Sequence, residues 1–550
     1  MAGVGWREAA RRRLDGEDFD LLVAGGGATG AAIARDAATR GLRVALCERG
    51  DFASQTSSRS SRLIHGGLRY LQHGDFHLVF ESLTERRRLL KTGPHLCRPR
   101  DFLYPSYAGR FPSPGLLALG VGLYDALALW RPPVRSRHFK SREVFATAPW
   151  LRGAGLLGAQ QYVDCQTDDA RLVLENVLDA ASAGAVVISQ VEILPPRKAS
   201  QRRAGGFRVV QALDHDCCDR LEIRARLVVN ATGPFCDGFA LGPPRLRPSL
   251  GVHLVLEGDR LLTMGRAAVI HSPRDGRLMF VLPAGTHTIV GTTETDWPGD
   301  GDPARPPRLD DEIRARRSDV DYLLEAVNHA FPPAAVHPSD VVSTFAGLRP
   351  LIARGPASPG ATSREHAIWS DASGCLNVAG GKLTTMRSMA EQAVDCAVEI
   401  LRDRGLEGAL RPCQTRARPL PGAGPPLRHA AGNLAPDIEA HLRASYGSRL
   451  GQVLALIAGD VSLARRLHPD LPYVAAELEF AVRSDLACEV DDVLWRRVPL
   501  ALVSRTQGLD VAEEAASLLA RERNWSEQRR ARSLSQFRDA INASRAWQAD

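Results

Sequence analysis

The alternation of apolar and polar positions near the N-terminus predicts a β-α-β unit. Residues 19–24 form a short apolar run, residues 28–40 have the composition of a helix, and residues 42–47 form a second apolar run. Gly41 lies where a helix commonly ends with a glycine. The pattern therefore predicts strand, helix and strand in direct succession, as in α/β folds with a parallel sheet.

The turn between the first predicted strand and the helix contains Gly25, Gly27 and Gly30. At this spacing the first glycine permits a tight bend, the second lets the backbone approach a pyrophosphate, and the third lets the helix pack closely on the strand. Glu48 ends the second strand, where a carboxylate can bind a ribose hydroxyl. These features together predict a dinucleotide site, without distinguishing NAD from FAD.

Composition narrows the class of protein but not its partner. The chain has 550 residues, 44% of them hydrophobic, which is enough for two or three domains. Its 70 Lys and Arg exceed its 63 Asp and Glu, and the net charge of +7 suits an anionic substrate, an anionic membrane or nucleic acid. The first 20 residues lack the apolar core of a secretion signal, and the longest apolar run, residues 115–130, contains Asp125. We therefore expect a cytoplasmic protein without a spanning helix.

The ten cysteines include no Cys-x-x-Cys pair and no cluster with histidine at zinc spacing. We expect reduced cysteines that mostly contribute to packing, and no metal site.

A loop rich in hydroxyl groups and glycine, residues 49–71, follows the β-α-β unit. Nicotinamide-dependent dehydrogenases usually continue into further β-α repeats at this point, whereas such a loop can lie along an extended cofactor, which favours FAD. The stretch "TSSRSSRLIHGGLRYL", together with the glycine turn and Glu48, resembles the FAD-dependent glycerol-3-phosphate dehydrogenases of the respiratory, aerobic type, which pass electrons to quinone.

Later segments resemble the same family in the same order, over roughly residues 18–402. Residues 168–187 predict a helix and a strand, residues 221–233 a strand that runs into Asn-Ala-Thr-Gly, and residues 377–401 a Gly-Gly-Lys turn before an amphipathic helix. The free amides of a helix N-terminus suit the anionic edge of a reduced flavin. The resemblance implies that FAD binds to Gly25, Gly27, Gly30, Glu48, Thr56, Ser57, Ser58, Ser61, His65, Gly66, Gly67, Ala231, Thr232, Gly233, Gly381, Lys382, Leu383 and Thr384.

Oxidation of a phosphorylated alcohol needs a proton acceptor and cations that hold the phosphate. Arginine suits phosphate because its rigid fork carries a charge that does not depend on pH. The resemblance implies a substrate site formed by Arg69, Tyr70, Arg349, Arg364 and Lys382, with His253, Arg349 and Lys382 as catalytic residues. For His253 two interpretations stay open, a proton acceptor and a structural residue in an apolar strand.

The order of the segments predicts an α/β fold with a discontinuous, Rossmann-like FAD-binding domain formed by residues 17–92, 161–245 and 374–402. Residues 93–160 and 246–373 then form a substrate-binding cap domain, whose alternating runs predict a mixed, mostly antiparallel sheet. After a Pro/Gly-rich linker, residues 425–550 predict a helical C-terminal domain.

The resemblance implies oxidation of sn-glycerol 3-phosphate to dihydroxyacetone phosphate, with hydride transfer to FAD and electron transfer to quinone. Two alternatives stay open: a soluble glycerol-3-phosphate oxidase that uses oxygen, and a related FAD-dependent oxidoreductase of amino or hydroxy acids. No basic stripe with interleaved aromatic residues accompanies the flavin motifs, so nucleic acid is not an expected partner. The oligomeric state stays open, with a homodimer as one option.

A quinone acceptor implies that the protein is peripheral on the inner face of the cell membrane. Leu534, Phe537 and Ile541 lie at helical spacing among arginines, as in a helix that docks on a bilayer. The same pattern also fits a helix that packs its apolar stripe on its own domain. Residues 115–130 are the second candidate for a docking surface.

Overall fold

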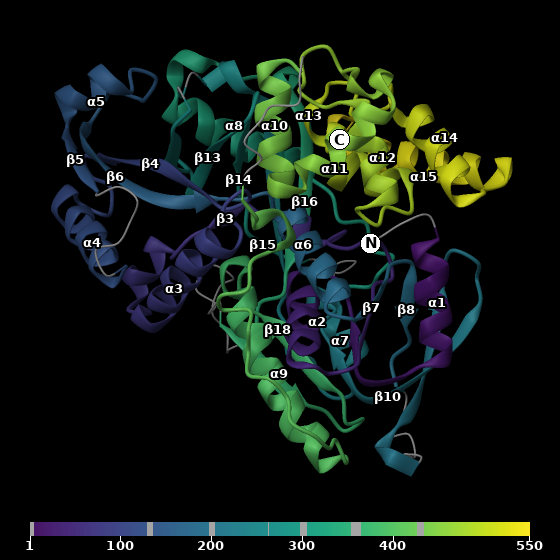
Figure 1. The fold of residues 1–550 in the computed structure, drawn as a ribbon. Helices are drawn as coiled ribbons and strands as arrows, with labels where there is room; N and C mark the ends of the chain where they lie inside the picture. Colours follow the sequence, from purple (N-terminus) through teal and green to yellow (C-terminus); the bar gives the residue numbers. More distant parts are fainter. Residues whose placement is uncertain are drawn as a thin grey trace.

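The computed structural model describes residues 5–128, 136–196, 204–261, 263, 265–297, 305–353, 365–425 and 434–549. Two β-sheets lie side by side, and helices of the C-terminal part pack against one of them (Figure 1). The expected α/β class and helical C-terminal part are confirmed.

The first sheet has a parallel centre, as the N-terminal pattern predicts. Its strands run in the order β17-β18-β10-β1-β2-β7, and β9 pairs with both β10 and β8. The pairs between β18, β10, β1, β2 and β7 are parallel, while β17, β9 and β8 add antiparallel edges. The strand bounds are β1 Asp18–Ala24, β2 Val44–Cys47, β7 Val186–Ile188, β8 Val191–Ile193, β9 Arg208–Asp214, β10 Arg220–Asn230, β17 His366–Ser370 and β18 Leu376–Gly380.

Both faces of this sheet are covered, which explains the continuous apolar runs of its strands. Leu21 and Val23 of β1 pack with α2 (Ala28–Arg40), α6 (Asp169–Ser182) and α9 (Met386–Asp403). Leu22 and Ala24 face the other side, where α1 (Trp6–Gly16) and the β8–β10 strands pack. Helix α2 has the predicted bounds and ends at Gly41, whose φ of 104° is left-handed, as expected for this glycine.

The second sheet is mixed and mostly antiparallel, as predicted. Its order is β15-β11-β14-β13-β12-β4-β6-β3, with β16 paired to β11 and β5 paired to β6, and β12 with β4 is its parallel pair in the described residues. The bounds are β3 Leu63–Ile64, β4 Arg98–Tyr107, β5 Arg137–Lys140, β6 Leu156–Gln166, β11 Ser249–Glu257, β12 Ala267–His271, β13 Leu278–Ala284, β14 His287–Gly291, β15 Thr295–Asp296 and β16 Val341–Arg349.

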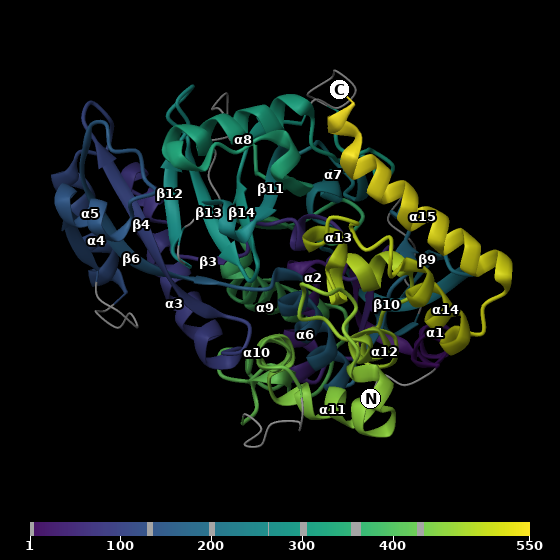
Figure 2. The same cartoon turned by 90° about the horizontal axis from the view of Figure 1, so that it is seen from above.

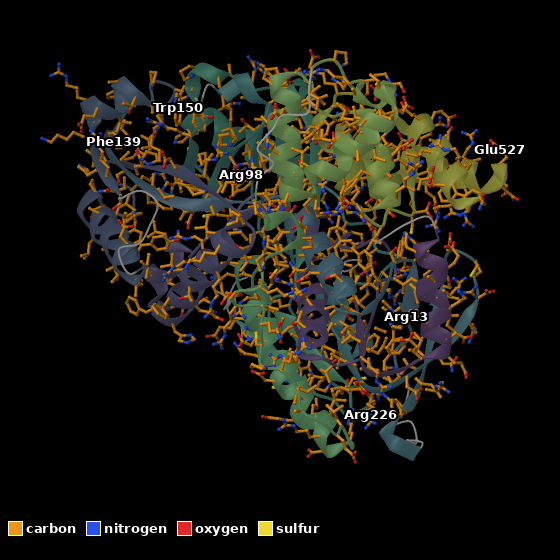
Figure 3. All side chains as sticks on the ribbon, in the orientation of Figure 1. Arg13, Arg98, Phe139, Trp150, Arg226 and Glu527 are labelled. Carbon is orange, nitrogen blue, oxygen red and sulfur yellow. The ribbon has the colours of Figure 1, made fainter. Side chains whose placement is uncertain are left out.

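Helices also cover this sheet on both faces. One face packs with α5 (Ser141–Thr147) and α8 (Arg317–Ala330), in a layer where Phe139 and Trp150 are buried (Figure 3). The other packs with α3 (Phe76–Thr92), α4 (Pro114–Leu127) and the C-terminal helices.

Strand pairing crosses the domain limits expected from the sequence. Strand β3 and most of β6 lie in ranges assigned to the FAD-binding domain, yet both pair in the second sheet. Strand β17 lies within residues 246–373 but pairs in the first sheet. The reason is that a period of two predicts a strand without revealing the sheet to which it hydrogen-bonds.

The C-terminal part is helical, and buried ion pairs link it to the rest of the chain. Its elements are α10 Pro436–Tyr446, α11 Leu450–Gly459, α12 Ala475–Arg483, a π-helical turn Asp492–Arg497, α13 Leu500–Val503, α14 Ala512–Arg523 and α15 Glu527–Arg545. Asp51, just after β2, binds Arg496 Nε and Arg497 Nη1 of the π-helical turn, each at 2.5 Å. All three side chains are buried, and buried charges are tolerated where they are fully paired.

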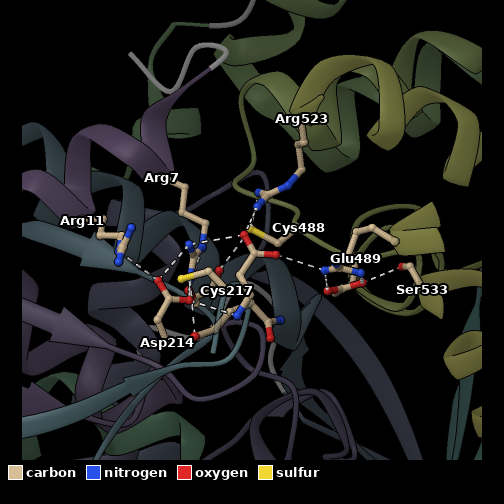
Figure 4. Close-up of polar contacts among 12 residues, drawn as sticks. Arg7, Arg11, Asp214, Cys217, Cys488, Glu489, Arg523 and Ser533 are labelled. Carbon is tan, nitrogen blue, oxygen red and sulfur yellow. Dashed lines mark hydrogen bonds and ion pairs between the residues drawn. The ribbon is translucent and has the colours of Figure 1, made fainter. Parts of the chain in front are cut away.

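A second ion network joins the N-terminal helix to the C-terminal part (Figure 4). Arg7 of α1 binds Asp214 at the end of β9, with 2.7 Å between Nη2 and Oδ1. Asp216 then accepts from Arg523 at 2.8 Å and from Arg529 at 3.1 Å. The network therefore ties three segments that are distant in the sequence.

Helix α15 crosses the C-terminal part and packs its apolar stripe inward (Figure 2). Leu534, Phe537 and Ile541 are all buried. The structure therefore supports the packing interpretation of this segment and excludes its stripe as an exposed docking surface.

Candidate active site

A cavity of about 1080 Å³ has walls formed by both sheets. The carboxyl ends of β1, β2, β10 and β18 open into it, together with the ends of β11 and β16. Ligands of open α/β sheets bind at the carboxyl ends of parallel strands, so this cavity is the candidate site.

At one end of the cavity the glycine turn exposes the start of α2. Gly25 has a φ of 101°, and a Cβ there would lie 2.7 Å from the Ala231 carbonyl oxygen. A Cβ on Gly27 would lie 3.0 Å from Ser57 Oγ, the atom that accepts from Ala28 N at 2.9 Å. A helix N-terminus of this kind, with small residues and a hydroxyl beside it, suits a pyrophosphate. Gly30 does not line the cavity, because it packs directly on the Gly25 carbonyl, as the helix-packing role of the third glycine requires.

Glu48 is fixed at the end of β2, facing the cavity. Its carboxylate accepts from Gly26 N at 2.6 Å and from Gly50 N at 2.8 Å, and burial raises its pKa. Next to it, Glu192 accepts from His215 Nε2 at 2.8 Å. Glu192 and His215 also line the cavity and were missed from the sequence, because neither lies in a recognisable motif.

The hydroxyl-rich loop crosses from the first sheet to the second. Thr56 Oγ1 donates to the Leu348 carbonyl at 2.7 Å, and Ser61 Oγ lies 2.9 Å from His253 Nε2. Its hydroxyls therefore bind the second sheet as well as facing the cavity. Ser58, by contrast, does not line the cavity.

Gly66 and Gly67 were expected at the cofactor, but the structure does not place them in the cavity wall. Gly66 N instead donates to the Tyr124 hydroxyl at 2.7 Å, and a Cβ at this position would lie 2.5 Å from the same oxygen. The Tyr124 hydroxyl donates in turn to Asp164 Oδ1 at 2.7 Å. Glycine is required here because α4 approaches the loop closely, a contact that sequence spacing does not reveal.

Two predicted catalytic residues lie on neighbouring strands of the second sheet. Arg349, at the end of β16, donates from Nη2 to Thr292 Oγ1 at 2.7 Å and to the Thr293 carbonyl at 3.1 Å. Its guanidinium lies over Gly251 of β11, where a Cβ would be 2.6 Å from Cζ. The threonines and the glycine were missed from the sequence, yet they hold the arginine in place.

His253 lies two residues further along β11 and is enclosed. Its ring stacks on Phe345, with 4.7 Å between centroids, and lies against Gly291. Burial, followed by the charges of Arg349 and Arg62, lowers its pKa to about 3. The imidazole is therefore neutral at physiological pH and able to accept a proton.

Lys382 adds a second positive charge to the cavity wall, where it lies beside Tyr70. Lys382 Nζ lies 3.7 Å from the centroid of the Tyr70 ring and 3.3 Å from Ser82 Oγ. The lysine follows Gly380 and Gly381, whose φ values of 82° and 77° turn the chain out of β18. Lys382 thus precedes the short helical turn that leads into α9.

The structure brings together most of the residues predicted for the site, whose roles stay predictions. Those that line the cavity are Gly25, Gly27, Glu48, Thr56, Ser57, Ser61, His65, Tyr70, Ala231, Thr232, Gly233, His253, Arg349, Gly381, Lys382, Leu383 and Thr384. Arg364 lies outside the described residues, as does the side chain of Arg69.

Two further parts of the wall were not predicted. Arg59 belongs to the hydroxyl-rich loop, so the signal that identified its neighbours could have found it. Residues 305–310 also line the cavity, but carry no periodic pattern or motif.

In the part of the chain that the structure describes, no group of His, Cys, Asp and Glu is placed to hold a metal ion. The assembled groups can bind an anionic alcohol and accept its proton.

Comparison with known proteins agrees with this chemistry. Residues 20–413 match the model of the family described as FAD dependent oxidoreductase, and residues 413–530 match the C-terminal domain of alpha-glycerophosphate oxidase. Glycerol-3-phosphate dehydrogenase 2 of Mycobacterium tuberculosis is 37% identical over 95% of this chain and 88% of that protein. The aerobic glycerol-3-phosphate dehydrogenase of Staphylococcus aureus is 32% identical over 94% and 92%, respectively.

Solved structures show the same architecture. The glycerol-3-phosphate dehydrogenase from Bacillus halodurans, complexed with FAD, has a TM-score of 0.77 and 28% identity, with 99% of this chain and 98% of that chain covered. The FAD-bound L-alpha-glycerophosphate oxidase from Mycoplasma pneumoniae has a TM-score of 0.55 and 15% identity, with 74% and 99% covered, and shows the fold alone. The glycine turn, the open N-terminus of α2 and the long cavity fit FAD. The chain therefore belongs to the family of the FAD-dependent glycerol-3-phosphate dehydrogenases, and its cofactor is FAD.

Proposed function

We propose that the protein oxidises sn-glycerol 3-phosphate to dihydroxyacetone phosphate. The observation that carries this proposal is the placement of two cations, Arg349 and Lys382, and a neutral imidazole, His253, in the wall of the cavity that contains the glycine turn. An oxidoreductase of amino acids needs a clamp for a carboxylate, whereas a phosphate calls for more than one cation. Relatives 32–37% identical over 94–95% of the chain are named glycerol-3-phosphate dehydrogenases, which supports the substrate.

FAD supplies the hydride acceptor when it is bound. Arg349 binds the phosphate through the fork that Thr292 and Thr293 hold in place, and Lys382 adds a second positive charge. These contacts orient the alcohol and select against uncharged glycerol.

His253 accepts the hydroxyl proton at Nε2, the atom that lies 2.9 Å from Ser61 Oγ. Its low pKa keeps the free enzyme ready to accept a proton, but also makes the imidazole a weak base. The negative charge of a bound phosphate offsets the effect of Arg349, so the pKa of His253 rises when substrate binds. Burial, the larger cause of the low pKa, is unchanged by the phosphate, so this rise is partial and His253 stays a weak base.

Quinone is the proposed electron acceptor, reduced at the inner face of the cell membrane by a peripheral, cytoplasmic protein. The name of the aerobic relative from Staphylococcus aureus and the net charge of +7 support this assignment. The second candidate acceptor is oxygen, because residues 413–530 match a domain named for an oxidase.

Anaerobic addition of sn-glycerol 3-phosphate to the purified protein tests the reaction and the substrate together. The flavin absorbance should bleach with this compound, and not with glycerol or with amino acids at the same concentration. Bleaching by an amino acid alone would place the protein among the related amino acid oxidoreductases.

Reoxidation then identifies the acceptor. We expect a soluble quinone analogue to restore the flavin absorbance much faster than oxygen does. Hydrogen peroxide released at the rate of substrate oxidation would show an oxidase instead.

A further inference from the structure

Exposed apolar side chains gather at one end of the molecule. In the described residues eleven large apolar side chains are exposed, and eight of them belong to residues 76–157. These eight are Phe76, Phe80, Phe111, Leu116, Leu119, Leu123, Phe145 and Leu157. Six of them belong to α3, α4 and α5, which lie at the end opposite α14 and α15 (Figures 1 and 2). Helices α3 and α4 pack on the same face of the second sheet, and exposed apolar side chains that gather in this way mark an interaction surface.

Helix α4 forms the clearest part of this surface, because it is apolar all round. Its outer face exposes Leu116, Leu119 and Leu123, which are 45%, 69% and 37% exposed. Between Pro114 and Leu127 the one charged residue is Asp125, and its carboxylate is buried and accepts from Ser136 N. A surface helix without exposed charges is unusual in a protein surrounded by water alone.

The inner face of the same helix binds the loop that borders the candidate active site. Tyr124 of α4 accepts from Gly66 N and donates to Asp164, and thereby holds the loop that continues to Tyr70. A helix is about 10–12 Å across. Whatever covers the leucines of α4 therefore comes within about one helix diameter of the loop that borders the cavity.

The charges beside this face distinguish between its two plausible occupants. Residues 105–145 contain six basic and two acidic residues in the sequence. Arg110 precedes α4, Arg137 follows Ser136, which binds Asp125 of α4, and both arginines are exposed. A second copy of the chain would bring these like charges together, whereas an anionic bilayer attracts them while it buries the leucines.

We propose that the outer face of α4 is the surface with which the protein docks on an anionic bilayer. The inference rests on the proposed function, which requires access to a quinone held in the membrane. In the described part of the chain no helix is long and apolar enough to span a bilayer.

Flotation of the holoenzyme with vesicles of phosphatidylcholine and phosphatidylglycerol tests this surface. The test variant carries Leu116→Gln, Leu119→Gln and Leu123→Gln. A matched control carries Leu241→Gln and Val461→Gln, which change apolar residues that are 40% and 78% exposed elsewhere on the molecule. Each α4 leucine should contribute roughly fivefold to partitioning, so the triple variant should bind about a hundredfold more weakly than the control or the wild type.

Two activity measurements separate docking from chemistry. Turnover of sn-glycerol 3-phosphate with a soluble dye should be equal in the wild type, the control and the triple variant. Turnover with quinone embedded in vesicles should fall in the triple variant alone.

Equal flotation of the triple variant and the wild type would overturn this surface and leave the proposed reaction intact. A wild-type protein that ignores vesicles would refute docking altogether. If the wild type is a dimer that does not bind vesicles, and the triple variant is a monomer, then the outer face of α4 contacts a second copy of the chain instead. Failure of flavin bleaching by the substrate would refute the proposed function, and flotation reports on the surface independently of it.

Discussion

The absence of a side chain at position 251 decides where Arg349 lies, and Gly251→Ala changes this without touching the arginine. An added Cβ would lie 2.6 Å from Cζ and 2.7 Å from Nη1 of Arg349, well inside van der Waals contact. The φ of Gly251 is negative, a conformation that alanine adopts readily, so the substitution should not strain the strand backbone. The guanidinium must therefore move away from Thr292 and Thr293.

The expected cost follows from the hydrogen bonds that a displaced guanidinium no longer makes to the substrate. A hydrogen bond to a charged group contributes about 1.5–3 kcal/mol. Loss of one such bond lowers kcat/KM by about 10- to 150-fold, because 1.4 kcal/mol corresponds to a factor of ten. Arg349→Ala removes the whole fork and should cost several kcal/mol, so the glycine variant should fall between it and the wild type.

Steady-state kinetics with sn-glycerol 3-phosphate measures this loss, and FAD content and thermal unfolding report on the fold. Gly238→Ala is the matched control, because Gly238 also lines the cavity but its added Cβ meets no atom within 4 Å. We expect a full complement of FAD and a near wild-type melting temperature in both variants. A Gly251→Ala enzyme with wild-type kcat/KM would refute the assignment of Arg349 to the phosphate.

Three further predictions concern the cofactor, the C-terminal part and pH. Gly27→Val should fill the space beside Ser57 and abolish FAD binding while circular dichroism stays native, and retention of FAD would contradict the pyrophosphate site. Asp51→Asn leaves Arg496 and Arg497 buried without their carboxylate and should lower the free energy of unfolding by about 3–5 kcal/mol in denaturant titration, whereas an unchanged midpoint would argue against the buried network. The pKa of His253 falls from 6.5 to about 3 on folding, so its contribution to stability is present above pH 6.5 and lost as pH falls toward 3. Relative to His253→Gln, the wild type should lose stability over this range, and parallel stability curves would contradict a buried neutral imidazole.

Local features of the chain could be predicted because short-range physical chemistry determines them. The bounds of α2 follow from its helical composition and from the left-handed Gly41 that ends it. The turn of Gly25, Gly27 and Gly30 needs no distant residue to explain why each glycine is small. The second sheet was likewise visible as alternating runs, because successive side chains of a strand point to opposite faces with a period of two.

Tertiary packing decided the features that depend on residues far apart in the chain. Gly66 and Gly67 were assigned to the cofactor, but Tyr124 of α4 takes the Gly66 amide, and no local pattern connects positions 58 residues apart. His253 could not be assigned from its apolar strand, because its low pKa arises from burial and from the charges of Arg349 and Arg62.

Helices α15 and α4 show most directly what the sequence determines and what the tertiary structure decides. The stripe of α15, Leu534, Phe537 and Ile541, is buried against the C-terminal core, whereas Leu116, Leu119 and Leu123 of α4 stay exposed. The sequence by itself determined that each segment has an apolar face, since helical spacing sets which residues share a side. Only the tertiary structure decided which face meets protein and which meets solvent, because that depends on how much apolar surface the neighbouring elements offer at each place in the fold.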